Sequence, residues 1–459
     1  MADVRQRLLQ ASGASGVSLI ARMLEQLLFV PVLLAAWSVE LFGEWLLIAA
    51  IPVYLALLDF GVVQSGSNEL AKRAGDGDEQ NMARFFRDYS SAFLLWSLIL
   101  FALLVVLVLV SPVSDWLRLS AISNGEAQGI FVLLIAGTLV SQNSLALIAG
   151  MRARRILPAG LLVRATGAFL RLGAAFIAVG LLDAGPIELA AILLISRIAE
   201  YGILALILAG RDLAPALNPF RKRTESLRGF LGSGMEFMLF PLAQSLILQG
   251  AVVVVGMTFG AAAVAIFVTH RTLSRMVSQV VQLAVVPLRA EAGLLQADEQ
   301  KAELGAILLS VSRLTFWAAI IVAAGLMALG PWFFEVWTGG KILFLPILFA
   351  TLLLATLFEA LWSVSSTIRM GTNRHRPLAW SYLAVSLAGL VLMLGLSQTG
   401  SLSLLSIGIV MAELMMTLIA IPITLSLVGL QKRSFLLGHC RPPIAELGAL
   451  WRRVVSGSR

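Results

Sequence analysis

Four long polar side chains recur along one apolar stretch of the sequence, at Arg271, Arg275, Gln279 and Gln282. Their spacings of four, four and three residues place them on one stripe of a helix, with Ser274 beside it. A guanidinium group presents a rigid fork of donors that matches the oxygens of a phosphate. The stripe therefore favours a site for an anion. The alternative is that both arginines pair with acids elsewhere in the chain.

Other apolar stretches also carry charged residues, which are costly inside a bilayer. Arg22 and Glu25 lie one helical turn apart, as do Arg197 and Glu200. Each pair is either a local ion pair or part of a wet cavity wall, and we favour the cavity wall for the first and the ion pair for the second. In all, seven arginines face six acids: Arg22, Arg164, Arg171, Arg197, Arg271, Arg275 and Arg313 against Glu25, Asp59, Glu200, Glu236, Glu359 and Glu413.

Asp59 and Glu236 have two open interpretations, as counter-ions for the arginines or as groups that couple transport to an ion. His270 is expected to be a packed, neutral histidine rather than a proton carrier. With one cysteine and three histidines in the chain, neither a metal site nor a cofactor is expected.

The segments that carry these charges are predicted to cross a membrane. Hydrophobic residues make up 59% of the 459 residues and charged residues only 13%, with a mean hydropathy of +0.91. A spanning helix needs about 20 apolar residues. Twelve such segments are predicted, centred near residues 25, 54, 99, 138, 170, 198, 244, 275, 317, 355, 387 and 415. The expected fold class is an all-α integral membrane protein.

Basic residues predict the orientation of these segments. With the N-terminus in the cytoplasm, the inner loops and tails hold 25 Lys and Arg residues, whereas the outer loops hold only Arg118 and Lys341. Such a bias predicts that both termini are cytoplasmic. It also accounts for the net charge of +8, so nucleic acid is not an expected partner.

The chain also contains a weak internal repeat. Phe42-Gly43 returns as Phe259-Gly260, and MRARRILP (151–158) aligns with MGTNRHRP (370–377), at offsets of 217 to 220 residues. Because six helices separate the copies, we expect two lobes related by a pseudo-two-fold axis along the membrane normal. The predicted parts are an N-terminal six-helix lobe (1–217), a basic cytoplasmic connector (218–230), a C-terminal six-helix lobe (231–430) and an amphipathic cytoplasmic tail (431–459).

Four prolines fall in the first two predicted helices of each lobe, at Pro31, Pro52, Pro241 and Pro287. Each removes a backbone hydrogen bond and favours a bend. Bent helices with polar faces are typical of the moving walls of a vestibule, which favours a transporter.

Three stretches carry a resemblance to a known family: LLDFGVVQSGSNELAKR (57–73), FGAAAVAIFVTHRTLSRMVSQVVQLAVVPLRAE (259–291) and LGPWFFEVWTGG (329–340). They resemble the polysaccharide exporters, or Wzx-type flippases, of the multidrug, oligosaccharidyl-lipid and polysaccharide exporter superfamily. The resemblance implies a MATE-like V-shaped fold that moves an undecaprenyl-pyrophosphate-linked oligosaccharide between leaflets by alternating access. Relatives carry arginines on helices one and eight in a central cavity.

The expected function is therefore a flippase of the bacterial cytoplasmic membrane that serves O-antigen, capsule or exopolysaccharide synthesis. Its expected partners are the lipid-linked oligosaccharide, membrane lipid and the polysaccharide assembly machinery. Arg22, Arg271 and Arg275 would bind the pyrophosphate, with Arg171 also in the site; Gln279, Gln282 and Ser274 would bind the proximal sugars; Glu25, Asp59 or Glu236 would balance charge or couple to an ion.

Three rival functions remain. A cation-coupled multidrug exporter could use the same fold, with the acids as drug and proton sites. A membrane enzyme such as a polysaccharide polymerase or ligase is disfavoured, because the predicted outer loops are short and nearly free of Arg and His. A scaffold for a glycosyltransferase complex would need neither a cavity nor movement.

Overall fold

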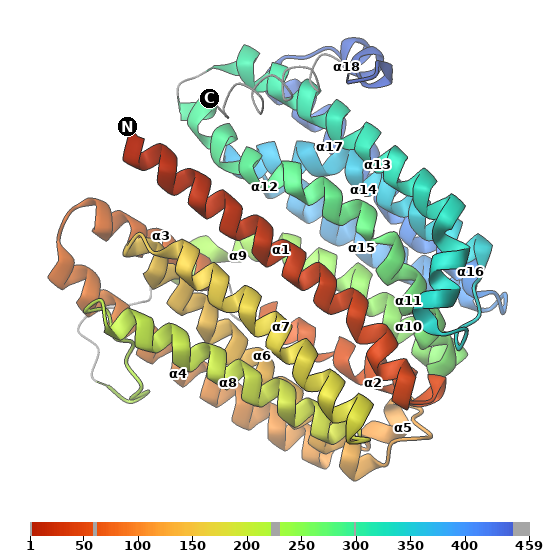
Figure 1. Ribbon diagram of the computed structural model, residues 1–459. Coiled ribbons are helices and arrows are strands. Elements are labelled where there is room, and N and C mark those ends of the chain that lie inside the picture. The colour runs from red at the N-terminus through yellow and green to blue at the C-terminus, as the bar shows by residue number, and fades with distance from the viewer. Residues whose placement is uncertain (1, 58–61, 222–229, 298–299, 444–459) are drawn as a thin grey trace. The chain divides into compact units, whose positions relative to one another are not determined.

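The computed structural model describes residues 2–57, 62–221, 230–297 and 300–443. These residues form helices joined by loops, without any strand (Figure 1). Ten helical segments in this part of the chain are long and apolar enough to cross a membrane. The predicted all-α fold is confirmed, and the chain is a multi-pass membrane protein.

Two of the twelve predicted spans are divided helices. Around residue 54, α2 (Val39–Ala50) is followed by the 3-10 helix η1 (Pro52–Leu57) and then by α3 (Val62–Gly75). Around residue 275, α11 (Ala261–Ser274) is followed by α12 (Met276–Ala297). Each divided helix is the second of its predicted lobe, so the interruption follows the sequence repeat.

The other ten spans match the segments predicted from hydropathy. Polar caps begin several of them: the side chain of Asp78 accepts from the backbone N–H of Asn81, and that of Ser123 from Glu126. The helices are α1 (Ala2–Ala36), α4 (Glu79–Val110), α6 (Asn124–Ala153), α7 (Leu157–Leu181), α8 (Pro186–Ala209), α9 with η2 and α10 (Phe230–Ser245, Leu246–Gly250, Ala251–Phe259), α13 (Lys301–Thr338), α14 (Pro346–Gly371), α15 (Arg376–Ser397), and α16 with α17 (Leu402–Leu405, Ile407–Val428). The short α5 (Val113–Leu117) and α18 (Lys432–Cys440) complete the described part.

The prolines interrupt the helices less uniformly than expected. Pro52 begins the 3-10 helix of the second span, where its missing N–H costs nothing further. Pro31 and Pro241 lie inside α1 and α9, which continue past them. The eighth span divides at Arg275 and not at Pro287, which α12 contains.

Contacts divide the chain into two compact units. Unit 1 is Met1–Ile266 with Trp337–Ile342, and unit 2 is Phe267–Val336 with Leu343–Arg459. The predicted connector lies mostly outside the described residues, and so does the predicted amphipathic tail from residue 444 onward. The lobes expected from the repeat therefore remain a prediction.

In unit 1, α1 packs along α7, α7 packs on α8, and α6 packs on both α8 and α3 (Figure 1). Ala21 of α1 meets Ala165 and Ala168 of α7 in a small buried cluster. Small side chains let two membrane helices approach closely. This close packing brings the charges of α1 and α7 within contact distance.

In unit 2, α14 packs on α12 and α17, and α15 packs on α17. His270 is fully buried among the rings of Phe334, Phe344 and Phe349. Its Nε2 accepts a hydrogen bond of 2.9 Å from the backbone N–H of Leu345. A ring nitrogen that accepts carries no proton, so His270 is the packed, neutral histidine that we expected.

Candidate functional site: a charged cavity in unit 1

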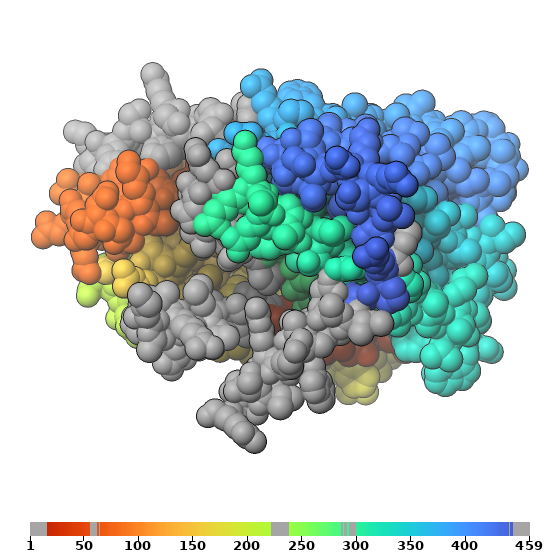
Figure 2. Space-filling model, turned by 90° about the horizontal axis from the view of Figure 1, so that it is seen from above, coloured from red at the N-terminus to blue at the C-terminus, as the bar shows by residue number. Residues whose placement is uncertain are grey.

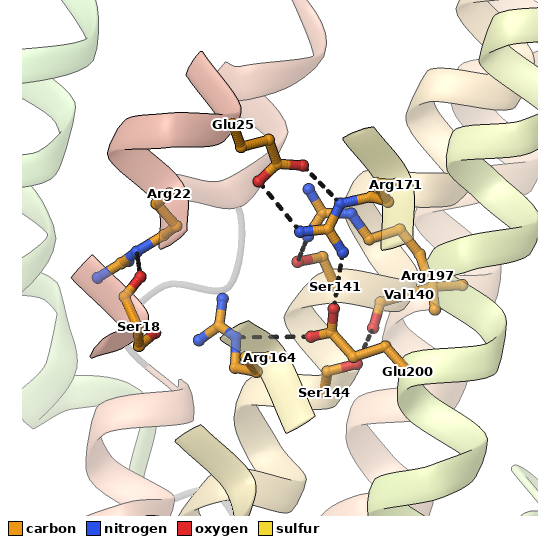
Figure 3. A network of polar contacts seen from close by, with 10 residues as sticks. All are labelled: Ser18, Arg22, Glu25, Val140, Ser141, Ser144, Arg164, Arg171, Arg197 and Glu200. Carbon is orange, nitrogen blue, oxygen red and sulfur yellow. Dashed lines mark hydrogen bonds and ion pairs between the residues drawn. The ribbon is translucent and has the colours of Figure 1, made fainter. Parts of the chain in front are cut away.

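Arg171 of α7 is the centre of a network of charged side chains (Figure 3). Its Nε donates to Glu25 of α1 at 2.7 Å and its Nη2 to the other oxygen of that carboxylate at 3.3 Å. Its Nη1 donates to Glu200 of α8 at 2.9 Å. All three nitrogens of one buried guanidinium thus hold two carboxylates from two other helices.

Glu200 also faces a second arginine. Its Oε1 lies 3.5 Å from Nε of Arg164, which is about two turns before Arg171 on the same face of α7. Room for this carboxylate depends on Gly167, where an added Cβ would lie 3.1 Å from Oε2 of Glu200 and 3.4 Å from Nη1 of Arg171. The sequence analysis did not single out Gly167, and the only available signal was its position midway between the two arginines.

Two further arginines of the network lack a carboxylate partner among the described residues. Arg197 of α8 donates through Nη1 to Ser141 Oγ of α6 at 2.9 Å. Arg22 of α1 donates through Nε to the backbone carbonyl of Ser18 at 3.2 Å and is otherwise exposed. The network therefore holds four arginines and two glutamates, which leaves an excess of positive charge.

A cavity of about 460 Å³ lies beside this network, between α1, α6 and α8. Glu25, Arg171, Arg197, Ser141 and Gln142 line its polar wall. Its remaining wall is mostly apolar and includes Phe29, Val53, Leu133, Leu134, Leu193 and Leu194. The cavity can receive a ligand that combines an anionic or hydroxyl-rich group with an apolar one.

The structure corrects the ion pair expected between Arg197 and Glu200, because Glu200 binds Arg171 and Arg164 instead. For Arg22 and Glu25 a cavity wall was the favoured expectation, and Glu25 lines the cavity while it binds Arg171. Both carboxylates reach across helix interfaces because one guanidinium there offers donors on two edges. The spacing in sequence showed which face carries the charges but not which partner each would find.

Arg171 was predicted as a substrate ligand. Because its three nitrogens are engaged by Glu25 and Glu200, it positions both acids along the cavity wall. Arg22, the other predicted ligand in this unit, keeps donors that no described residue uses.

The predicted polar stripe lies in unit 2, at the division between α11 and α12. Arg275 and Gln282 are half-buried, and the guanidinium of Arg275 forms no ion pair with a described residue. Arg271 lies 5.4 Å from the centre of the Phe267 ring. Ser274 is buried, and its hydroxyl donates to the carbonyl of Arg271 at 3.0 Å, so sugar binding there would require exchange of that bond. Gln279 is half-buried on the same helix face.

Two acids that the sequence analysis placed in the spans lie in unit 2 and accept hydrogen bonds from uncharged side chains. Glu359 accepts from Ser278 Oγ at 2.6 Å, and Glu413 accepts from Trp362 Nε1 at 2.7 Å. Asp59 and the side chain of Glu236 lie outside the described residues, so their predicted roles stay predictions. Among described residues, none of the His, Cys, Asp and Glu side chains form a group that could hold a metal ion.

The two basic residues of the predicted outer loops both cap helices of unit 1. Arg118 Nη1 donates to the carbonyl of Met257 in α10 at 3.0 Å. Lys341 Nζ donates to the carbonyls of Leu34 and Ala35 at the end of α1, the latter at 3.2 Å. Lys341 follows Arg118, and Met257 follows Leu34, by the same 223 residues. This offset is close to, but not within, the 217 to 220 residues of the sequence repeat, and each contact joins one predicted lobe to the other.

Comparison with solved structures identifies the fold. A multidrug resistance MATE family transporter of the MOP superfamily, in an inward-facing conformation, matches with a TM-score of 0.70 at 18% identity, over 89% of this chain and 94% of that chain. A MATE protein in complex with MaL6 matches with a TM-score of 0.67 at 16% identity, over 92% of this chain and 96% of that chain.

A MOP superfamily transporter from Pyrococcus furiosus, described as having a binding pocket of reverse polarity, matches with a TM-score of 0.67 at 17% identity, over 92% of this chain and 95% of that chain. The chain has the MATE-type transporter fold. No protein-family profile and no curated protein sequence matches the chain. Because these matches extend over 89% to 92% of the chain, the fold similarity includes residues of both units.

Proposed function

We propose that the chain is a flippase that moves an undecaprenyl-pyrophosphate-linked oligosaccharide from the inner to the outer leaflet by alternating access. The MATE-type fold supports a transporter. The observation that favours an anionic cargo is the uneven sharing of acids in the unit 1 network. Arg171 engages both of its glutamates, and Arg22 and Arg197 have no carboxylate partner among the residues that the structure describes.

The total charge of the spans argued against this cargo, since seven arginines and six acids nearly cancel. Pairing changes that conclusion. Glu25 and Glu200 are bound to Arg171, with Glu200 also near Arg164, and Glu359 and Glu413 hold a serine and a tryptophan. In the unit 1 network four arginines share two glutamates, and Arg22 and Arg197 form no ion pair with a described residue. A pyrophosphate can supply the missing negative charge there.

The cavity in unit 1 suits the junction between phosphate and sugar. Arg197 would contact the phosphate oxygens in the cavity, and Gln142 and Ser141 offer partners for sugar hydroxyls. Arg22 does not line the cavity; it is exposed one turn before Glu25 on α1, and would contact phosphate oxygens outside it. In unit 2, Arg271, Arg275, Gln279, Gln282 and Ser274 keep their proposed roles as ligands for phosphate and sugar. The polyprenyl tail would stay in the bilayer, because no protein surface is needed to keep it from water.

Alternating access requires the predicted lobes to separate at one end of the protein at a time. The caps that Arg118 and Lys341 place on α10 and α1 are contacts that separation at the predicted outer end would break. Last-turn carbonyls lack partners within their own helix and attract cations. Two such matched contacts would hold that end closed until cargo binding compensates for their loss.

The second candidate is a cation-coupled multidrug exporter. Two of the solved structures with this fold carry the name MATE, and one is a multidrug resistance transporter. In that case Glu25 and Glu200 would be the functional groups, and Arg22 and Arg197 would only tune their charge.

A deletion strain separates the two functions. If the gene encodes the flippase, mass spectrometry should detect accumulated lipid-linked oligosaccharide, and drug susceptibility should stay unchanged. The wild-type gene should reverse the accumulation, whereas a gene carrying Arg22→Gln with Arg197→Gln should not. Raised drug susceptibility without accumulated lipid-linked sugar would support the exporter and refute the flippase.

A further inference from the structure

A second, smaller cavity in unit 1 is distinct from the charged network and is lined by arginines. It measures about 360 Å³ and forms where α3 ends, α4 begins and α6 ends. Arg73, Arg154 and Arg155 line it, with Glu79 as the one acid. The α3–α4 part of its rim belongs to the orange surface in Figure 2.

Arg73 and Arg154 are held in place by contacts with neighbouring side chains. Arg73 donates to Glu69 and to Asn81, each at 2.8 Å, and its guanidinium lies 4.3 Å from the centre of the buried Phe85 ring. Arg154 lies 3.3 Å from Glu79, whose side chain is 76% exposed. Because Glu79 is exposed to solvent, it offsets little of the positive charge of Arg154. The buried Nε of Arg154 makes no hydrogen bond within the described residues.

Arg155 occupies a backbone position that favours a different residue. Its φ of 61° is left-handed, and it follows α6 as the residue that closes the helix end. Glycine or asparagine is usual there, and Asn373 takes the equivalent position after α14, with a φ of 55°. An arginine in this place directs a guanidinium to the cavity, and that guanidinium has no side-chain partner among the described residues.

The cavity lies at the ends of two spans, Glu79–Val110 and Asn124–Ala153. Helix ends of membrane spans lie at the depth of lipid headgroups. We propose that Arg73, Arg154 and Arg155 form a binding site for a phosphate group, presented by an anionic lipid headgroup or by free phosphate. Arginine forks match phosphate oxygens, and anionic lipid attracts basic clusters at the cytoplasmic surface, where the basic-residue bias places this end.

This site does not depend on the proposed function, because any membrane protein can hold a lipid at its headgroup level. Its residues belong to neither the charged network nor the larger cavity. Loss of phosphate binding here would leave the cargo assignment untouched.

The test variant is Arg155→Gly. Because glycine adopts a left-handed backbone without strain, this change removes the guanidinium and should not harm folding. The matched control is Arg84→Gln, an exposed arginine of α4 that does not line the cavity. The full chain in neutral detergent would be titrated with dioctanoyl phosphatidylglycerol, dioctanoyl phosphatidylcholine and sodium phosphate, with thermal unfolding as the readout.

We expect phosphatidylglycerol to bind the wild type and Arg84→Gln alike, and Arg155→Gly about fivefold more weakly, the factor for one basic side chain near an anionic surface. Arg154→Gln added to Arg155→Gly should weaken binding further. A lipid site predicts little effect of sodium phosphate, whereas a free-phosphate site predicts an equal shift with phosphate alone. Equal binding of phosphatidylglycerol by Arg155→Gly and the control, or equal effects of the two lipids, would overturn the proposal.

Discussion

Arg171 shows at the scale of one residue how a membrane interior can be rich in charge and still stable. Its guanidinium joins α1, α7 and α8 through Glu25 and Glu200 (Figure 3). Burying an ion is costly unless partners and hydrogen bonds replace water. Here each carboxylate gains them from another helix, so the network also fixes how three helices pack.

Glu200→Gln should destabilise unit 1 strongly. It leaves Arg171 and Arg164 with one carboxylate between them, and breaking a buried ion pair typically costs about 3 to 5 kcal/mol. Unfolding of the purified protein in detergent would measure the loss. Glu188→Gln, at the exposed start of α8, should have almost no effect, and equal stability of the two variants would contradict the role given to the network.

His439 should make stability depend on pH. It lies in α18, outside the spans, and burial among Phe316 and Phe435 lowers its pKa from 6.5 to about 4. Between pH 6.5 and about 4, the imidazole of His439 is protonated in the unfolded chain but stays neutral in the folded chain. This contribution to stability is thus complete above pH 6.5 and is lost as pH falls towards 4.

The measurement is the midpoint of unfolding at pH 7, 5.5 and 4.5 for the wild type and for His439→Phe. The phenylalanine keeps the aromatic packing and cannot titrate, so its curve should fall less steeply with pH. Parallel curves for the two proteins would show that His439 does not cause the dependence.

At the scale of elements, the sequence predicted where the helices lie but not how they meet. Ten of the twelve segments predicted from hydropathy are candidate spans in the described part of the chain, and the other two are the divided helices. The sequence could not predict the ion-pair partner of each charged residue, because a spacing of three residues fits both a pair within one helix and two contacts to other helices. Arg22 with Glu25 and Arg197 with Glu200 illustrate the second outcome.

Close helix contacts depend on particular glycines, and Gly43 of α2 is the clearest case. A Cβ there would lie only 1.9 Å from the carbonyl oxygen of Ala261, at the start of α11. Gly43→Ala should therefore force these two helices apart and lower the unfolding temperature markedly. Gly325→Ala is the control, because its Cβ meets nothing within 4 Å and alanine favours a helix by about 1 kcal/mol. Equal effects of the two changes would refute this contact.

At the scale of the whole molecule, orientation in the membrane remains the prediction on which the function depends. A bias of 25 to 2 basic residues places both termini and the arginine-lined cavity on the cytoplasmic side. The match to solved structures shows the fold but not the direction of the spans in a membrane.

Thiol labelling in intact cells would test the orientation. In a Cys440→Ser background, which removes the one native cysteine, Thr399→Cys should react with an impermeant maleimide. Asp76→Cys should react only after the membrane is permeabilised. Both positions are exposed in the structure, so the reverse pattern would mean that the chain has the opposite orientation.

The central claim is that the unpaired arginines of unit 1 serve the passage of a pyrophosphate headgroup. The most direct test is movement of an undecaprenyl-pyrophosphate-linked oligosaccharide across proteoliposomes that contain the purified chain, followed with a lectin or hydrolase added outside. We predict transfer by the wild type, a loss of about tenfold or more in Arg22→Gln with Arg197→Gln, given about 1.4 kcal/mol or more for two charged contacts, and near-normal transfer by Glu188→Gln. Wild-type vesicles that match empty ones, or a double variant that matches the wild type, would contradict the claim.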